Sequence, residues 1–580
     1  MKLVIVESPK KARAIKGFLG EGWHVEASRG HVRDLPETEL GVDVDGGFRP
    51  QYEVLPGKGN LVKKLVKAIR AADEVYLATD PDREGEAIAW HLLQLAGNLK
   101  SKHVYRAVFN AITASAVKAA LAEPRPLDEA LVEAQSARRI VDRLVGYLVS
   151  PVACKALDGR LSAGRVQSIA LRLVVERERE IESFTPETFF TLKARFAVDG
   201  IQFEANLHRL KDADVRFSAR EQAEKVAGLL SGASFWVGKA GQTLKLRNPL
   251  PPFTTSSLQQ AAAKGLGLSP EKTMQLAQTL YEQGLITYHR TDGVAVAPEA
   301  QQVAREVIAR EYGDAYLPPT PPAYQVKAAN AQEAHEAIRP TDVSKLPEED
   351  ADGDGAKLYT LIWRRFIASQ MNPARYTLTG ALIHAGKSTD KPYPLVFKAN
   401  GRELVFDGFL RVYEEPEDGD ADDADGSVPA LKEGQALGLV ELPIDEVQTR
   451  PPSRFSEAGL VQALEKYGVG RPSTYASMVS VVKSKGYVAL KQQRLAPTDT
   501  GVKLCDFLVE RFPQVFDVGY TARLEAALDR VAAGNMNQQD VLSTFWRGFQ
   551  PQLKTATEYA LAQVKARQSP RPLVLHPAEE

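Results

Sequence analysis

Hydrophobic residues in the N-terminal part of the chain form short runs that alternate with segments of helical spacing. An apolar run over Leu3–Val6 precedes helical spacing over Lys10–Leu19. The same order returns at Glu74–Thr79, which a helical pattern over about Glu84–Leu95 follows. Strands that alternate with helices predict an α/β unit with a parallel sheet. The segment 41–59 is rich in Gly and Pro and is predicted to leave this sheet.

The remainder of the chain changes pattern several times. Residues 128–183 have mainly helical spacing, and their arginines make them locally basic. Polar and apolar residues alternate over 184–246, and strand character returns near 376–413. Helical patterns dominate 256–310 and 456–534. The chain is therefore predicted to combine α/β, helical and β-rich parts.

Three segments between or after these patterns are predicted to be irregular. The acidic run 414–426 is predicted to be a solvated loop that joins two strands. The tail beyond Arg567 has few apolar residues to bury. GALIHAGKST, 380–389, resembles a phosphate-binding P-loop, but its spacing is one residue too long and no helix follows. We expect a hairpin turn there, and no ATP site.

One internal repeat is present. TSSLQQAAAKGLGLSPEKTMQLAQTLYEQGLIT aligns without gaps on EAGLVQALEKYGVGRPSTYASMVSVVKSKGYVA. The alignment pairs Pro270 with Pro472 and Gly284 with Gly486. Each copy predicts a helix, a glycine-containing turn with Pro at the start of the next helix, and a Gly stop before a strand, the pattern of helix-turn-helix or winged-helix DNA-binding units. The alternative is two unrelated helical hairpins of similar length.

Composition and charge narrow the class of protein. The chain has 580 residues and a mass of 63.5 kDa, which is too long for one hydrophobic core. Its formal net charge is −1 with a pI near 6.8, so a polyanionic partner must be met by local basic surface. Two cysteines, Cys154 and Cys505, exclude a disulfide framework and a four-cysteine zinc site. No segment has the apolar length of a secretory signal or a membrane span, so a cytoplasmic protein with no membrane partner is expected.

An acidic cluster follows the second predicted strand. Asp80, Asp82 and Glu84 stand at alternate positions after it, and Glu7 ends the first strand in the same way. Because the carboxyl ends of adjacent parallel strands form one crevice, Glu7 is expected near Asp80 and Asp82. Carboxylates alone suit a hard cation such as Mg²⁺. The alternative, that acids in a first helical turn stabilise its dipole, explains Glu84 but not Asp80 and Asp82.

These residues carry a family resemblance. A strand-ending Glu with DxDxE resembles the Toprim domain of topoisomerases, bacterial primases and some nucleases. GLITYHRTDG, 284–293, resembles the active-site tyrosine motif of bacterial type IA DNA topoisomerases. Tyrosine has a pKa near ~10, so its attack on a phosphodiester needs positive charge nearby, which Arg290 offers. AQEAHEAIRPTD, VESPKKA, QSARRIVDRLVGY, LSAGRVQS and EKYGVGRPSTYA also match this family, and the wording EAHEAIRPT resembles topoisomerase I more than topoisomerase III.

The resemblance implies roles for individual residues. Tyr288 is the implied nucleophile, with Arg290, Glu7, Lys11 and His335 as further catalytic residues. Glu7, Asp80, Asp82 and Glu84 are the implied Mg²⁺ ligands. The residues implied to contact DNA are His31, Arg106, Arg138, Arg139, Asp142, Tyr147, Arg165, Gln167, Arg471, Ser473 and Thr474.

The resemblance also implies a fold and an activity. The fold is a toroid of a Rossmann-like Toprim domain, helical winged-helix-like domains and a β-rich arch. The expected ranges are 1–34 and 60–127 for Toprim, 35–59, 128–183 and 446–562 for the helical single-strand-binding domain, 184–248 and 373–445 for the arch, 249–372 for the tyrosine domain and 563–580 for a tail. The implied enzyme is a monomeric, nucleoid-associated isomerase that relaxes negatively supercoiled DNA without ATP, through a single-strand break and a 5′-phosphotyrosyl link. It needs Mg²⁺, and no zinc is expected because the chain has no zinc-ribbon cysteines.

Two other classes of function remain open from the residues alone. A Toprim nuclease or primase would use the same acids, but it leaves the motif around Tyr288 and the repeat unexplained. A helix-turn-helix protein that binds DNA without catalysis leaves the acidic cluster unexplained. A Tyr288→Phe variant separates these alternatives, because only the topoisomerase requires the tyrosine for cleavage.

Overall fold

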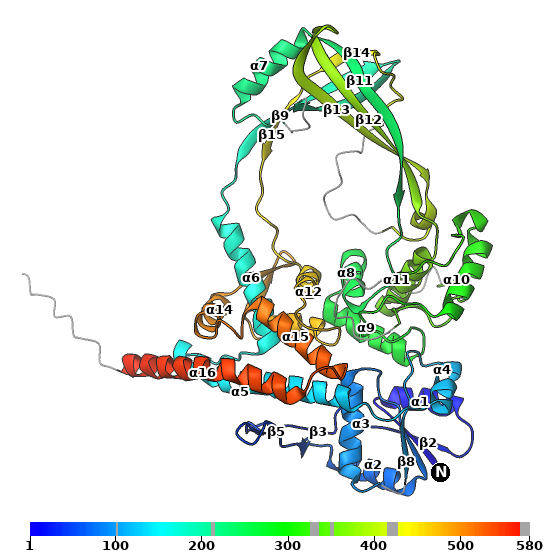
Figure 1. The fold of residues 1–580 in the computed structure, drawn as a ribbon, viewed down its shortest axis with the longest axis vertical. Coiled ribbons are helices and arrows are strands. Elements are labelled where there is room, and N and C mark those ends of the chain that lie inside the picture. Colours follow the sequence, from blue (N-terminus) through cyan, green and yellow to red (C-terminus); the bar gives the residue numbers. More distant parts are fainter. Residues whose placement is uncertain (100–101, 210–214, 325–335, 348–352, 415–426, 569–580) are drawn as a thin grey trace, which may run out of the picture.

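The chain forms a ring-like outline in which an arch stands on a helical base (Figure 1). This computed structural model describes residues 1–99, 102–209, 215–324, 336–347, 353–414 and 427–568. The arch joins the base on opposite sides of the ring, on one side next to α6 (Arg165–Ser183) and on the other next to α11 (Asp354–Ser369). The predicted combination of α/β, helical and β-rich parts is confirmed.

The N-terminal part is a four-stranded parallel sheet with helices on both faces. Its strand order is β2-β1-β7-β8, and β1 pairs in parallel with both β2 and β7. Leu3 and Ile5 face one hydrophobic cluster, whereas Val4 and Val6 face another, as the alternation of a buried strand requires. The elements are β1 (Lys2–Val6), α1 (Pro9–Phe18), β2 (Trp23–Ala27), α2 (Gly59–Ala71), β7 (Glu74–Leu77), α3 (Arg83–Ala96), β8 (His103–Arg106) and α4 (Ala114–Ala122). The carboxyl ends of β1 and β7 are therefore adjacent.

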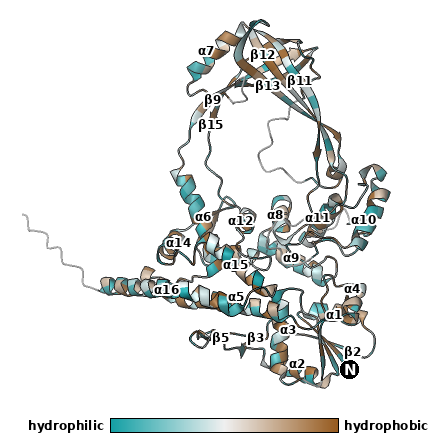
Figure 2. Ribbon diagram, viewed as in Figure 1, coloured by the Kyte–Doolittle hydropathy of each residue, from teal (hydrophilic) through white to brown (hydrophobic). Residues whose placement is uncertain are grey.

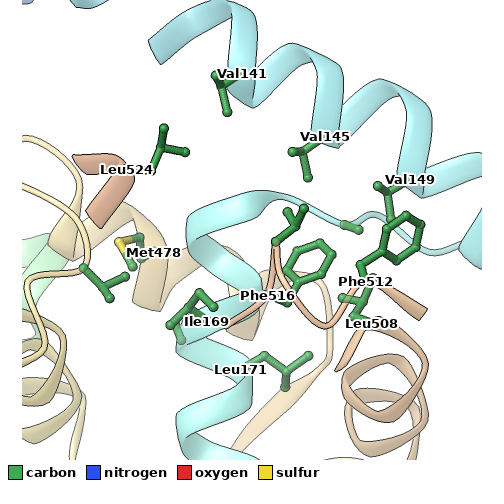
Figure 3. Close-up of a cluster of buried hydrophobic side chains, with 14 of the residues drawn as sticks. Val141, Val145, Val149, Ile169, Leu171, Met478, Leu508, Phe512, Phe516 and Leu524 are labelled. Atoms are coloured by element: carbon green, nitrogen blue, oxygen red, sulfur yellow. The ribbon is translucent and has the colours of Figure 1, made fainter. Parts of the chain in front are cut away.

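The helical base surrounds one large hydrophobic core. Valines spaced four residues apart on α5 face Phe512 and Phe516, which lie between α14 and α15 (Figure 3). The glycine-rich excursion joins this core through Leu35 and Phe48. The elements are α5 (Glu129–Leu157), α6, α14 (Asp499–Arg511), α15 (Val518–Ala532) and α16 (Gln538–Gln568), with the short ladders β3 (Arg33–Asp34) with β6 (Glu53–Val54) and β4 (Val42–Asp43) with β5 (Arg49–Pro50).

The arch is an antiparallel sheet that closes on itself. Its order is β10-β13-β12-β11-β14-β9-β15, and β10 also pairs with β9. Phe196, Phe235 and Phe397 pack together in its core, and hydrophobic and hydrophilic colours alternate along β11–β13 (Figure 2). The elements are β9 (Thr188–Val198), β10 (Ile201–Arg209), α7 (Arg220–Ser231), β11 (Ser234–Arg247), β12 (Ala374–Ser388), β13 (Lys391–Phe406), β14 (Ala436–Glu441) and β15 (Ile444–Gln448). The hairpin turn predicted within 380–389 lies only at the end of that segment, because residues 380–388 belong to β12 and the chain turns before β13 begins at Lys391.

The two repeat copies lie against each other. The first is α8 (Thr255–Leu266) with α9 (Pro270–Glu282), and the second is α12 (Glu457–Lys466) with α13 (Tyr475–Ser484). Helix α8 packs on α12 and α9 on α13, so like packs on like. The hairpin β16 (Val488–Lys491) with β17 (Arg494–Pro497) follows the second copy, and α10 (Pro298–Glu311), η1 (Asp314–Tyr316), α11 and η2 (Gly408–Arg411) complete the part around the first.

The structure differs from the sequence expectations in several places. Helix α7 interrupts a region predicted to be strands. Pro270 begins α9 as predicted, but Pro472 lies in the turn and α13 begins only at Tyr475. The first copy is followed by an isolated bridge at Ile286 rather than a regular strand, and α16 extends into the predicted tail. Residues 415–426 and 569–580 lie outside the described residues. No helix among the described residues is long and apolar enough to cross a membrane.

Candidate active site

The ends of β1 and β7 bring two predicted catalytic residues together. The backbone N–H of Asp80 donates to Glu7 Oε1 at 2.9 Å. Ser8 caps α1 by accepting from the Lys11 N–H at 3.2 Å, with Pro9 in the first turn, so that Lys11 projects from that turn. The Lys11 ammonium pairs with the Asp80 carboxylate and is 1% exposed. The strand-end rule therefore predicted this grouping of Glu7 with Asp80.

Asp82 has two contacts, one to its own helix and one to a distant segment. Its Oδ1 accepts from the Gly85 N–H at 2.8 Å and caps α3. Its Oδ2 accepts from the Tyr288 hydroxyl at 2.6 Å. A Cβ at Gly85 would lie 2.2 Å from the Asp80 carbonyl oxygen, so only glycine allows this tight turn. The carboxylate thus joins the parallel sheet to the segment that follows the first repeat copy.

Tyr288 is held on both sides and is only 2% exposed. Its N–H donates to the Asn110 carbonyl at 2.7 Å, beyond the end of β8. On the other side, the Thr287 hydroxyl donates to the Ala337 carbonyl at 2.7 Å. Gly284 has a φ of +75°, and a Cβ there would lie 2.5 Å from the Ile112 carbonyl oxygen. The glycine stop is therefore required both for its backbone conformation and for the close approach that places Tyr288.

The charges around Tyr288 keep its hydroxyl protonated in this arrangement. Burial and the Asp82 and Asp80 carboxylates raise the pKa of Tyr288 well above its usual value, against the lowering effect of Arg290. Burial would lower the pKa of Arg290, but Tyr288 and then the Asp82 and Asp80 carboxylates outweigh it and raise that pKa. The tyrosine is thus a hydrogen-bond donor to Asp82, with a fixed positive charge close by. This is a closed arrangement, because the Tyr288 hydroxyl is buried against Asp82.

The donor chemistry at the strand ends fits a divalent cation. Burial and the Asp80 carboxylate raise the pKa of Glu7 to about 8, which reports crowded negative charge. Carboxylate oxygens are the ligands that Mg²⁺ prefers. Among the residues that the structure describes, no three His, Cys, Asp or Glu side chains already surround one point as metal ligands. Lys11 and Tyr288 instead hold Asp80 and Asp82, so a cation would compete with both contacts.

Glu84 is held by residues other than the predicted metal ligands. It lies 3.2 Å from His31 Nε2 and accepts from Gln135 Nε2 at 3.1 Å. Burial would raise the pKa of Glu84, but the hydrogen bond to His31 and the nearby Arg138 lower it to about 2. Burial would also lower the pKa of His31, but the same hydrogen bond raises it. Glu84 and His31 therefore form an ion pair at the start of α3.

Arg106 is placed differently from the predicted DNA contact. It is 1% exposed and donates to Glu86 Oε2 at 2.8 Å. It also donates to the Leu77, Thr79 and Asp80 carbonyls at 2.8, 2.9 and 2.6 Å. Its guanidinium is thus used to brace the turn that carries Asp80, and it has almost no surface for DNA. Sequence reasoning could not distinguish a brace from a phosphate contact.

The other predicted DNA-contacting residues lie along the base of the ring, mostly in ion pairs. Arg139 forms a bidentate pair with Asp34 at 2.8 and 2.7 Å. The Tyr147 hydroxyl donates to the Thr38 carbonyl at 2.7 Å. Arg165 is buried between Asp142 and Glu525, which Arg138 also approaches. Arg471 pairs with Asp529, and the Thr474 hydroxyl accepts from the Arg471 N–H at 2.9 Å. Ser473 is exposed, and Gln167 is half-buried near the start of α6.

Several residues around this site were not predicted from the sequence, and one predicted residue, His335, cannot be compared with the structure. Tyr281 lies between Lys11 and Tyr288, with Lys11 Nζ 4.7 Å from its ring centroid. Glu525 and Asp529 of α15 pair with the arginines, and no motif marked them. Their four-residue spacing on one predicted helix was the available signal. His335 lies outside the described residues, so its predicted role stays a prediction.

Comparison with known proteins agrees with this arrangement. Residues 126–543 match the DNA topoisomerase family, and residues 2–112 match the Toprim domain. DNA topoisomerase 1 of Zymomonas mobilis is 45% identical over 569 residues, covering 96% of this chain and 46% of that protein. The Rickettsia felis protein of the same name is 43% identical over 583 residues, covering 97% and 74%. The chain therefore spans about half the length of the first relative and about three quarters of the second.

A solved structure extends this likeness to the whole fold. The structure of topoisomerase I from Thermotoga maritima matches with a TM-score of 0.83 and 36% identity. The match covers 95% of this chain and 90% of that one. It includes the parallel sheet, the helical base and the arch, as the coverage requires. The chain belongs to the bacterial DNA topoisomerase I family of type IA enzymes, with a Toprim domain at its N-terminal end.

Proposed function

We propose that this chain is an ATP-independent type IA topoisomerase that relaxes negatively supercoiled DNA by breaking and rejoining one strand. The observation that carries the proposal is the 2.6 Å hydrogen bond between Tyr288 and Asp82. It puts a candidate nucleophile from the repeat region against the acidic cluster of the parallel sheet. A nuclease or primase that uses only the acids has no need of a buried tyrosine at this point.

The residues of the site support a specific order of events. The closed arrangement must open first, because Tyr288 is 2% exposed. Its oxygen then attacks phosphorus in line, the new bond is a 5′-phosphotyrosyl link, and the bond to the 3′-oxygen breaks. Arg290 and Lys11 stabilise the negative charge that develops on the phosphoryl oxygens. Religation reverses these bonds, and no nucleotide is consumed because the phosphotyrosine retains the bond energy.

Two proton transfers accompany the bond changes. The tyrosine loses its proton as it attacks, and the departing 3′-oxygen gains one. Glu7 lies at the end of β1 beside Asp80 and Lys11, and we assign to it the proton that moves to and from the 3′-oxygen. His335 is a further candidate for a phosphate contact by resemblance alone.

The substrate is single-stranded DNA exposed by negative supercoiling. We place it along the basic base of the ring, where Arg138, Arg139 and Arg471 meet its phosphates. The arch bends to open the ring while the second strand passes. The enzyme is proposed to act as a monomer in the cytoplasm, associated with the nucleoid.

Mg²⁺ is proposed to bind between Glu7, Asp80 and Asp82, where it would neutralise charge beside the broken phosphodiester. Asp80→Asn with Asp82→Asn keeps the helix cap but removes both charges. We expect relaxation to fall by about a hundredfold or more, while binding of a single-stranded oligonucleotide is retained. Full relaxation in EDTA by the wild type would contradict the metal role.

The direct test of the activity uses negatively supercoiled plasmid with Mg²⁺ and no ATP. The wild type is expected to relax the plasmid stepwise and to form a covalent protein–DNA adduct. Tyr288→Phe removes only the nucleophilic oxygen, so both products should disappear. Tyr281→Phe is the matched control, because Tyr281 is also a buried tyrosine and its ring centroid lies 5.2 Å from that of Tyr288. Nicking that survives in Tyr288→Phe would overturn the proposed function.

A further inference from the structure

Two carboxylates on one face of α15 hold arginines from four different segments of the chain. Glu525 and Asp529 are four residues apart, so their side chains lie one helical turn from each other. Helix α15 packs on α5 in the base of the ring (Figure 1). Among the described residues, four arginines meet three carboxylates in this network: Arg83, Arg138, Arg165 and Arg471 with Asp142, Glu525 and Asp529.

The two carboxylates differ in depth. Glu525 is fully buried, accepts from Arg165 Nη2 at 2.7 Å and lies 3.4 Å from Arg138 Nη1. Removing the charge of Glu525 would leave the buried guanidiniums of Arg165 and Arg138 without this carboxylate partner. These ion pairs are therefore a fixed part of the base. Asp529 stands at the edge of the network, with 14% of its side chain exposed. Of the two, only Asp529 is reachable by a ligand from solvent.

Asp529 links two elements that approach the candidate active site from different directions. Its Oδ1 accepts from Arg83 Nη2 at 2.7 Å, and its Oδ2 pairs with Arg471 Nη2. Arg83 is the first residue of α3 and directly follows Asp82. Arg471 lies in the turn between α12 and α13 of the second repeat copy. One carboxylate therefore ties the start of α3 to that turn.

The geometry is that of a phosphate site filled by a carboxylate. An anion held between two guanidiniums is the arrangement that arginine offers to either group. The neighbouring donors also remain incompletely used, because Arg138 Nη2 and Arg165 Nη1 are buried and have no hydrogen-bond partner within the described part of the chain. Arg138 and Arg165 share Glu525 and Asp142 in the buried part of the network, whereas Asp529 at its edge contacts Arg83 and Arg471.

We propose that Asp529 takes the place of a DNA backbone phosphate between Arg83 and Arg471, and that a phosphate of bound single-stranded DNA displaces it. This inference rests on the proposed function, because it requires the strand to lie on the base of the ring. Asp529 is then a positioning residue: its release frees the start of α3, next to Asp82, when DNA arrives. Binding of the strand is thereby coupled to opening of the contact between Asp82 and Tyr288.

The test measures affinity for DNA without cleavage. A fluorescein-labelled single-stranded oligonucleotide is titrated in EDTA at several salt concentrations, and its anisotropy is followed. Asp529→Asn keeps the size of the side chain but removes the competing charge. We expect binding to tighten about three- to tenfold. The slope of the logarithm of the binding constant against the logarithm of salt concentration should become steeper by about 0.7 for each additional phosphate that the protein neutralises. A purely structural Asp529 predicts unchanged or weaker binding, and either result would overturn the inference.

Two controls separate displacement from a general loss of negative charge. Asp506→Asn removes a carboxylate that pairs with Arg179 on an exposed surface outside the network, and it should leave affinity within error of the wild type. Arg471→Gln combined with Asp529→Asn should cancel the increase in affinity. Tightening equal to that of Asp529→Asn in either control would count against the proposal.

A measurement on the wild type covers the case in which Asp529→Asn does not fold. Hydrogen exchange of α15 is compared with and without the oligonucleotide, and the residues near Asp529 should lose protection on binding. Unchanged or increased protection there contradicts displacement. Failure of the wild type to bind the oligonucleotide at all would overturn the proposed function itself, and with it this inference.

Discussion

The two repeat copies use one helical scaffold for two different tasks. In the first, α8 and α9 lead through Gly284 to Tyr288, which is 2% exposed against Asp82. In the second, α12 and α13 lead through Gly486 to the β16–β17 hairpin, whose tip is exposed. The alignment that pairs the glycines also pairs Tyr288 with Leu490, which is 48% exposed.

The difference lies in what surrounds the end of each copy. The segment after α9 is enclosed by the loop after β8 and by residues 337–340, which fix its backbone by hydrogen bonds. The second copy instead contributes Arg471 from its inner turn, where it pairs with Asp529. A common supersecondary unit thus presents the proposed nucleophile from one end in the first copy and a cationic side chain from its middle in the second. The fold of the unit does not determine its chemistry.

Substituting the two equivalent glycines should give the largest contrast between the copies. Both have positive φ, +75° at Gly284 and +71° at Gly486, so alanine is strained at either by about 1–2 kcal/mol. A Cβ at Gly284 also meets the Ile112 carbonyl oxygen at 2.5 Å, whereas nothing lies within 4 Å at Gly486. The clash adds about 1–3 kcal/mol and displaces Tyr288.

The measurement for this pair is the melting temperature together with the rate of plasmid relaxation. Gly284→Ala should lower both strongly, and Gly486→Ala should lower the melting temperature modestly with relaxation nearly intact. Equal losses of relaxation in the two variants would mean that the glycine after α9 has no special part in placing the nucleophile.

The contacts between the copies give a smaller contrast. Ser256 is 1% exposed and donates to Glu465 Oε2 at 2.6 Å, which joins α8 to α12. Ser480 donates to Glu271 Oε2 at 2.7 Å in an exposed position between α13 and α9. Because the Ser256 hydroxyl is buried and also accepts from Gln260 Nε2 at 3.0 Å, Ser256→Ala should cost about 1–1.5 kcal/mol. Ser480→Ala should cost about 0.5 kcal/mol or less.

Thermal unfolding of the two serine variants, with relaxation measured alongside, tests whether the copies act as one body. A larger loss of stability in Ser480→Ala than in Ser256→Ala would reverse the expected order. It would place the main link between the copies at the α9–α13 contact instead.

The sequence predicted the parts of the site that follow from local rules. Glu7 and Asp80 meet because parallel strands end at one edge, and the Gly stops follow from the repeat. Tyr288 came from family resemblance, because a tyrosine after a helix is otherwise an ordinary packing residue. Its contact with Asp82 joins residues 206 positions apart, which no local pattern encodes.

Burial and pairing of the arginines were also beyond local rules. The sequence motifs predict the same role, a DNA contact, for Arg106 and Arg471. In the structure, Arg106 is 1% exposed and donates to the turn that carries Asp80, whereas Arg471 pairs with Asp529 at the edge of the arginine network. The partner in that pair, Asp529, comes from a helix that matched no motif. Tertiary packing decides which side of an arginine faces DNA, and a single sequence does not report it.

The central claim is that Tyr288 carries the DNA in the covalent intermediate. The most direct measurement traps the wild-type enzyme on DNA with denaturant, digests protein and DNA, and identifies the nucleotide-bearing peptide by mass spectrometry. The account predicts a single modified residue, Tyr288, linked to a 5′-phosphate, with the same adduct in Tyr281→Phe. An adduct on any other residue, or one that persists in Tyr288→Phe, would contradict it.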